Sequence, residues 1–271
     1  MELQDLILFM KVSQQKWIEK LRDGEAWFGA INGYIKKAEE SNNNEQGDKY
    51  EGVFARCKKN SLIIQNSQQK FGDDLEIIDD GEFCFLRRKS CRAMLAFCMY
   101  GIKKNELALV GEIDSTKEIK TCEFEYRFEQ KMYECFLQDG TSPSEVAGFY
   151  GSAGHIIDSI GEALIKDNYK WKIKIVNYDI DLTKEFYIEP QSDYPELWHK
   201  RKDLAYQHEI RFIIYNKLQN LNGVVINYTP ISPSSANVAV GQLYFTGTAE
   251  LKEINDEQRG DTYDESLFNL R

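Results

Sequence analysis

The chain has 271 residues, of which 42% are hydrophobic and 13% aromatic, so it is long and apolar enough to bury a substantial core. Its formal charge of −10 at pH 7 gives the surface no general attraction for nucleic acid, so any contact with phosphate must come from local basic clusters. No apolar run approaches membrane-spanning length, and the N-terminus lacks the basic start of a signal peptide. We therefore expect a single cytoplasmic domain over residues 1–271, without membrane contact.

The pattern of the cysteines is consistent with a cytoplasmic location. No two form a C-x-x-C pair, and several lie among apolar residues, which is typical of reduced thiols in a protein core. There are six in all: Cys57, Cys84, Cys91, Cys98, Cys122 and Cys135.

The N-terminal part predicts a strand, a helix, a glycine and a second strand. Leu6–Val12 is apolar enough for a strand, Ser13 can cap a short helix, and Gly24 can end it. Glu25–Ile31 then has the character of an extended segment, and Tyr34–Glu40 that of a helix.

Two carboxylates follow a polar loop, in the sequence DKYEG at 48–52. Asp48 and Glu51 stand three residues apart beside Gly52, where the backbone can approach a ligand closely. Such a pair could bind a cation or the hydroxyls of a sugar. A solvated turn is the alternative.

The next part predicts three short strands and a helix. Leu62–Gln65, Leu75–Ile78 and Glu82–Leu86 are separated by strong turn signals. Arg87–Gly101 is expected to be helical because four apolar residues recur at positions i, i+3, i+4 and i+7. These are Cys91, Met94, Leu95 and Cys98.

The segment around 104–140 resembles an insertion of meandering strands, expected at Leu107–Ile113, Thr121–Phe128 and Met132–Leu137. After it, SPSE at 142–145 has the pattern of a capping box, which predicts a helix with an apolar stripe from Val146 to Leu164. Four glycines in that stretch indicate close packing or a break. Because GSAG at 151–154 would then lie inside a helix, we do not expect it to be a phosphate loop.

The most site-like stretch is WHKRKDLAYQHEIRFIIY at 198–215. It begins as a basic helical turn, and from Gln207 onward apolar and polar residues alternate as in a half-buried strand. Gln207, Glu209 and Arg211 would share one face, directly after Lys200 and its basic neighbours. The alternative is a surface pair of Glu209 and Arg211, which would contribute little to stability.

The remaining strands are expected at Trp171–Tyr178, Val224–Tyr228 and Val238–Thr246, with a frayed tail over about 255–271. Strands dominate, and the connections are too short for a βαβ pattern. The sequence therefore predicts the α+β class with a largely antiparallel sheet system.

Several landmarks together resemble a bacterial family whose members are described as proteins of unknown function. They are the opening strand, helix, glycine and strand; Asp48, Glu51 and Gly52; Cys84-Phe85 leading through Met94 to Tyr100; and Lys200 followed by Gln207-x-Glu209-x-Arg211. The family usually has glutamate where this chain has Gln207.

The opening unit and the late Q-x-E on a strand also look like the NAD-binding core of ADP-ribosyltransferases. That resemblance implies a split, mainly antiparallel β-sandwich with flanking helices, and NAD as the cofactor. It also implies that Glu209 bonds the nicotinamide ribose and supports the positive charge that forms as nicotinamide leaves, that Gln207 orients the acceptor, and that Lys11 meets the dinucleotide. Arg211 is a further candidate catalytic residue beside Glu209 and Gln207. Asp48 and Glu51 are candidates for cofactor contact.

Three hypotheses remain open at this point. The first is a transferase that modifies a macromolecular acceptor, as bacterial toxins and phage-defence proteins do. The second is a metal-dependent nuclease or other hydrolase, with Asp48, Glu51 and Glu209 as metal ligands and Lys202 or Arg211 on the phosphate. The third is a binding or inhibitory protein without chemistry.

Overall fold

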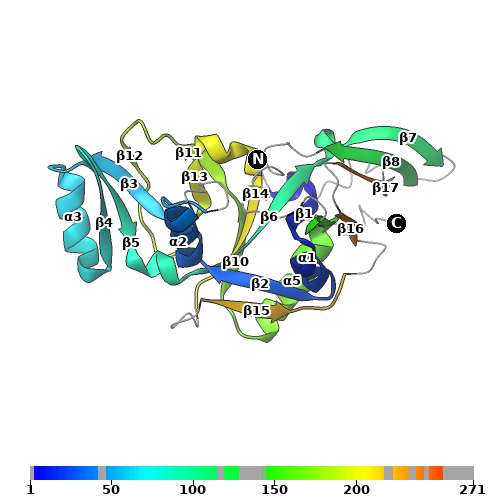
Figure 1. Ribbon diagram of the computed structural model, residues 1–271, viewed down its shortest axis with the longest axis horizontal. Helices are drawn as coiled ribbons and strands as arrows, with labels where there is room; N and C mark the ends of the chain where they lie inside the picture. The colour runs from blue at the N-terminus through cyan, green and yellow to red at the C-terminus, as the bar shows by residue number, and fades with distance from the viewer. Residues whose placement is uncertain are drawn as a thin grey trace, which may run out of the picture. The chain divides into compact units, whose positions relative to one another are not determined.

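The computed structural model describes residues 3–41, 47–114, 119–127, 142, 145–216, 222–231, 236–240 and 244–252 (Figure 1). The chain divides into two compact units, each made of separate stretches of sequence. Unit 1 comprises Met1–Ala26, Met99–Asp167 and Ile226–Arg271, and unit 2 comprises Trp27–Cys98 and Asn168–Val225. Helices and mostly antiparallel sheets confirm the predicted α+β class. The single domain expected from the sequence stays a prediction.

Unit 1 is built on strand β1 (Leu6–Gln14), which lies between two antiparallel partners. One is residues 99–103 of β6 (Leu95–Lys103), and the other is β9 (Val146–Ser152), which also pairs with β16 (Ala236–Val240). The core of this sheet contains Leu8, Met10, Tyr100, Ile102 and Tyr150. The opening strand is thus where the sequence predicts it.

Helices and a second sheet complete the described part of unit 1. Helix α1 (Gln15–Arg22) begins after the strand has run through Gln14, so Ser13 belongs to the strand and does not cap the helix. The second sheet joins β7 (Ala108–Asp114), β8 (Ile119–Arg127) and β17 (Tyr244–Lys252). It confirms two of the meandering strands. The third, Met132–Leu137, lies outside the described residues, as does the tail.

The long helix predicted after residue 145 is wrong in its first half. The turn of the capping box does form, since Ser142 N–H donates to Glu145 Oε2 at 3.0 Å. However, strand β9 follows it, and helix α5 (Ala153–Lys166) begins only at Ala153. Every residue of β9 is buried, and a strand buried on both faces has no alternation to distinguish it from a helix. The GSAG sequence therefore spans the last two residues of β9 and the first two of α5, contrary to the prediction that it lies inside a helix.

The first sheet of unit 2 is built on residues 95–98 of β6. These residues lie next to β14 (Glu209–Ile214). On its outer side β14 pairs with β10 (Trp171–Ile175). Residues 27–30 of β2 (Glu25–Ala30) pair with β6, and β15 (Gly223–Asn227) pairs with β2. The aromatic rings of Phe28, Phe97 and Phe212 contact one another in this core.

The second sheet of unit 2 is antiparallel, in the order β12 (Phe186–Tyr187), β3 (Val53–Lys58), β5 (Phe83–Arg88), β4 (Leu75–Asp80). Helix α3 (Leu62–Phe71) packs on one face of it. Helix α2 (Ile31–Ser41) packs near the first sheet, and β11 (Asn177–Ile180) pairs in parallel with β13 (His199–Arg201).

Two predictions in unit 2 are wrong. Leu62–Gln65 is not a strand but the start of α3, because the Ser61 hydroxyl caps the helix by accepting the N–H of Ile63 at 3.1 Å. The helix predicted at Arg87–Gly101 is instead a 3-10 turn at Lys89–Ala93 followed by β6. Of the four residues in the predicted stripe, only Leu95 and Cys98 lie on β6. That strand is buried on both faces for most of its length, so its apolar residues do not alternate as in a half-buried strand.

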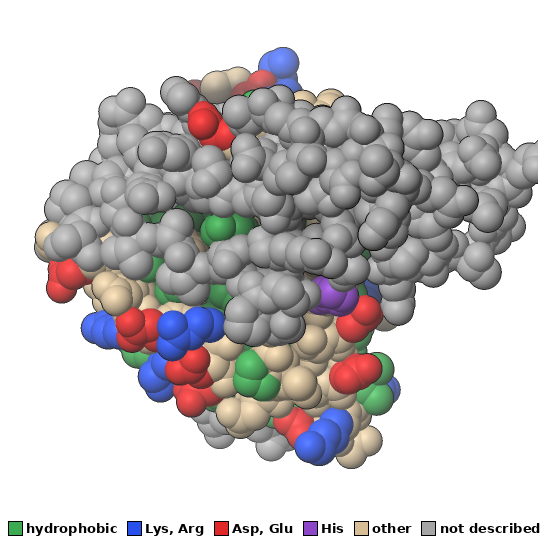
Figure 2. Space-filling view, turned by 90° about the vertical axis from the view of Figure 1, so that its right-hand side faces the viewer, with side chains coloured by type: hydrophobic (Ala, Val, Ile, Leu, Met, Phe, Trp, Pro, Cys, Tyr) green, Lys and Arg blue, Asp and Glu red, His purple; other side chains and the backbone are tan. Residues whose placement is uncertain are grey.

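No helix in the part of the chain that the structure describes is long and apolar enough to cross a membrane. On the face drawn in Figure 2, acidic and basic side chains of the described residues are interspersed, and no area of a single sign stands out among them. The free cysteines in the described core are Cys57, Cys84 and Cys91, with Cys98 partly exposed.

Candidate functional site

The candidate site is centred on Glu209, the first residue of β14. A 3-10 helix at Lys202–Gln207 precedes it, and His208 turns the chain into the strand with a left-handed φ of 40°. As the alternation predicts, Glu209 and Arg211 lie on the same face. They are 6% and 1% exposed, so the alternative of a surface pair is wrong.

Arg211 binds both glutamates of the site. Its Nε donates to Glu209 Oε1 at 2.6 Å, and its two terminal nitrogens donate to the two oxygens of Glu51 at 3.0 and 3.1 Å. One terminal nitrogen also donates to the carbonyl of Leu197 at 2.6 Å. A planar guanidinium can satisfy this many acceptors in a fixed arrangement, so Arg211 orients both carboxylates.

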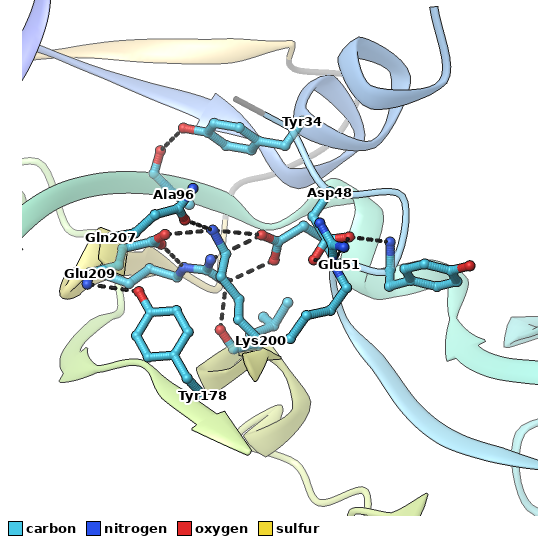
Figure 3. A network of polar contacts seen from close by, with 12 residues as sticks. Tyr34, Asp48, Glu51, Ala96, Tyr178, Lys200, Gln207 and Glu209 are labelled. Atoms are coloured by element: carbon cyan, nitrogen blue, oxygen red, sulfur yellow. Dashed lines mark hydrogen bonds and ion pairs between the residues drawn. The ribbon is translucent and has the colours of Figure 1, made fainter. Parts of the chain in front are cut away.

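Lys200, on β13, supplies the second cation. Its Nζ lies 2.6 Å from Glu209 Oε2, 3.3 Å from Glu51 Oε1 and 3.0 Å from the side-chain oxygen of Gln207 (Figure 3). The structure therefore brings together four of the six predicted site residues: Gln207, Glu209 and Glu51 contact one ammonium group, and Arg211 binds the two glutamates.

Asp48, the fifth predicted site residue, lies in the turn at residues 48–52. Asp48 and Glu51 are only 2% and 3% exposed, so the alternative of a solvated turn is also wrong. Asp48 accepts the N–H of Tyr50 at 2.9 Å and lies 3.4 Å from Nε of Arg201. Gly52 has a φ of +70°, and a Cβ there would come within 3.2 Å of Cys91. The glycine allows a close approach of the backbone to Cys91 in the protein core.

The charges in this cluster are fixed by their neighbours. Burial alone would raise the pKa of Glu209, but Arg211 and Lys200 outweigh it and lower that pKa, so Glu209 is ionised. Burial would likewise lower the pKa of Lys200, and the two glutamates raise it. Burial and the charge of Glu51 raise the pKa of Asp48.

Three residues that sequence reasoning did not connect with Glu209 interact with it. The hydroxyl of Tyr178 accepts the backbone N–H of Glu209 at 2.9 Å. The half-buried Tyr34 and Cys98 interact electrostatically with Glu209, and the Cys98 thiol forms a hydrogen bond with its carboxylate. They come from α2, β6 and β11, far from Glu209 in the sequence, and no local pattern marks them.

Lys11 is the sixth predicted site residue. It lies on β1 of unit 1, opposite Phe149, and its predicted role toward the dinucleotide stays a prediction. Lys202, considered for a phosphate contact, is exposed and lies at the start of the 3-10 helix.

The arrangement is an ionised carboxylate, oriented by two cations, with the amide of Gln207 and the hydroxyl of Tyr178 beside it. Among the described residues, no three His, Cys, Asp or Glu side chains are grouped so as to hold a metal ion. Compared with protein-family models, curated proteins and solved structures, the chain matches none of them.

Proposed function

We propose that unit 2 carries an NAD-binding transferase site of the ADP-ribosyltransferase kind, with Glu209 as its central carboxylate. The observation that carries the proposal is that cations hold both carboxylate oxygens of Glu209, with Gln207 bound to the same ammonium group. A carboxylate fixed in advance stabilises positive charge developing on a substrate without having to reorganise. Because such an interaction strengthens in the transition state, it raises the rate.

The side chains around Glu209 fit the nicotinamide riboside end of NAD. If NAD binds there, breaking its bond between nicotinamide and the ribose would leave positive charge on the ribose. The half-buried ring of Tyr178 offers the aromatic surface that a planar cationic ring prefers. Glu209 can accept a ribose hydroxyl, and Gln207 carries the amide that would orient an acceptor.

Lys200 has to change partners for this role. Its ammonium now lies against Glu209 Oε2 and also contacts Gln207 and Glu51. If Lys200 keeps its contacts with Gln207 and Glu51 and gives up its contact with Glu209, Oε2 of Glu209 becomes available to a ligand. Arg211 remains on Oε1 and preserves the orientation of the carboxylate.

The same contacts favour a second candidate, a binding protein without chemistry. All four carboxylate oxygens of Glu51 and Glu209 already accept from Arg211 or Lys200, as in a network that holds three chain segments together. A hydrolase with Asp48, Glu51 and Glu209 as metal ligands would have to displace both cations, so the contacts favour it least.

Thermal melting with NAD, ADP-ribose or a divalent metal ion tests the proposal. At a hundredfold excess over the dissociation constant, NAD should stabilise the protein by about 2.7 kcal/mol. ADP-ribose, which lacks nicotinamide, should stabilise it less, and magnesium or manganese little. Stabilisation by the metals alone would favour the hydrolase. No response to any of the three would favour the binding protein.

A further inference from the structure

Trp27, on β2, lies on the same face of the first sheet of unit 2 as Glu209. Its neighbour Phe28 contacts Phe212 of β14 in the aromatic core, and side chains alternate between the two faces along each strand. Trp27 therefore points to the face that carries Glu209 and Arg211. Phe28 and Phe212 are fully buried, whereas Trp27 is 53% exposed. An indole ring with that much open surface can stack on a ring of a ligand.

Two glycines make room for the indole ring. A Cβ on Gly223, on the neighbouring strand β15, would overlap the ring of Trp27, and a Cβ on Gly29 would lie 3.4 Å from its Nε1. Neither glycine has the left-handed φ that favours this residue, so the backbone conformation does not call for glycine at either position. The two glycines instead let the indole lie against the sheet, and any side chain at position 223 would displace it.

Two residues that interact with Glu209 lie on the side of Trp27. Cys98, whose thiol forms a hydrogen bond with the Glu209 carboxylate, is on β6, the strand between β2 and β14. The Tyr34 hydroxyl lies 3.7 Å from the Cβ position of Gly29, and Glu209 interacts with it electrostatically. Because neighbouring strands are about 4.8 Å apart, Trp27 stands roughly 10 Å from Glu209 across the sheet. A ligand with two ring systems can thus contact both residues.

NAD is a ligand of this kind, because it carries nicotinamide at one end and adenine at the other. In the proposed function the nicotinamide end lies at Glu209, beside Tyr178, so the adenine must find a surface some way along the sheet. A nucleobase stacks well on an aromatic side chain, and this contact is strong enough to matter for affinity. We propose that Trp27 stacks on the adenine ring of NAD. This inference rests on the proposed function, whose site it extends.

Calorimetric titration with NAD, ADP-ribose and nicotinamide mononucleotide separates the two ends of the dinucleotide. ADP-ribose carries only the adenine ring, and nicotinamide mononucleotide carries only the nicotinamide ring. Trp27→Ala should weaken binding of NAD and ADP-ribose at least about tenfold and leave nicotinamide mononucleotide unchanged. Trp17→Ala removes a similarly exposed tryptophan from α1 and is the matched control, with binding of all three ligands unchanged. The proposal is overturned if Trp27→Ala binds ADP-ribose as tightly as the wild type, or if only nicotinamide mononucleotide is weakened.

A second variant guards against loss of folding. Trp27→Phe keeps an aromatic ring at the same place, and ADP-ribose should quench the tryptophan fluorescence of the wild type but not that of Trp27→Phe. Quenching that persists in Trp27→Phe overturns the proposal.

Nicotinamide release from NAD by the wild type distinguishes this inference from the proposed function. Release together with ADP-ribose binding that does not depend on Trp27 overturns the adenine contact alone. ADP-ribose binding that depends on Trp27, without any release, supports the adenine contact and contradicts the transferase. If neither NAD nor ADP-ribose binds, both proposals are overturned.

Discussion

Arg211 binds Glu51, which lies 160 residues earlier in the chain, through both of its terminal nitrogens. The same guanidinium holds Glu209 on its own strand, so one side chain ties the turn at 48–52 to β14. Both partners are nearly fully buried, and a buried charge that loses its counter-ion is strongly destabilising. The position of Glu209 therefore depends on a residue that is remote in sequence.

Glu51→Gln should reveal this dependence. The substitution keeps the shape of the side chain but leaves Arg211 and Lys200 with one carboxylate between them. We expect it to lower the free energy of unfolding by about 3 to 5 kcal/mol, measured by urea denaturation. Glu189→Gln, in an exposed pair with Lys70, is the control and should cost less than about 1 kcal/mol. Equal losses in the two variants would contradict the network.

The contribution of Glu209 should depend on pH in one direction. Its pKa is lowered in the folded protein, so its stabilising effect is complete above the unfolded value of about 4.3 and is lost as pH falls through the folded value. The difference in unfolding free energy between wild type and Glu209→Gln should thus be constant from about pH 6 to 9 and shrink below about pH 4. A difference that stays constant down to about pH 2 would show that the carboxylate is not stabilised by its charge.

Gly52→Ala should destabilise the turn that presents Glu51. A φ of +70° is strained for any residue with a Cβ, and here the Cβ would also meet Cys91. Gly81 has a φ of +71° with open space around it, so Gly81→Ala measures the conformational cost alone, about 1 to 2 kcal/mol. Gly52→Ala should cost more than Gly81→Ala in the same denaturation experiment. If Gly52→Ala costs the same as Gly81→Ala or less, the contact with Cys91 adds nothing to the loss of stability.

The thiols should differ in reactivity. Burial, followed by the neighbouring Cys84, raises the pKa of Cys57 to about 12, and burial also raises that of Cys91. Cys98 is partly exposed. Under native conditions iodoacetamide should label Cys98 before Cys57, Cys84 and Cys91, as followed by peptide mass spectrometry. Early labelling of Cys57 would show that its strand opens readily.

Sequence patterns located the strand of the site but not its surroundings. Glu209 and Arg211 alternate with apolar residues because the two faces of β14 meet different neighbours, and that alternation is visible in the sequence. Strands β6 and β9 are buried on both faces, so their patterns could be mistaken for helices. The burial of Asp48 and Glu51 depends on Lys200, Arg201 and Arg211, and no local pattern could show it.

The most direct test of the central proposal measures nicotinamide release from NAD by wild type and Glu209→Gln, each divided by its folded fraction from a melting curve. Dividing by the folded fraction removes any loss of stability from the comparison. If the Glu209 carboxylate stabilises positive charge on the ribose, its removal should raise the barrier by about 3 to 4 kcal/mol and slow release per folded molecule at least about a hundredfold. Equal release per folded molecule from a variant that melts early would contradict the proposal and leave Glu209 with a structural role.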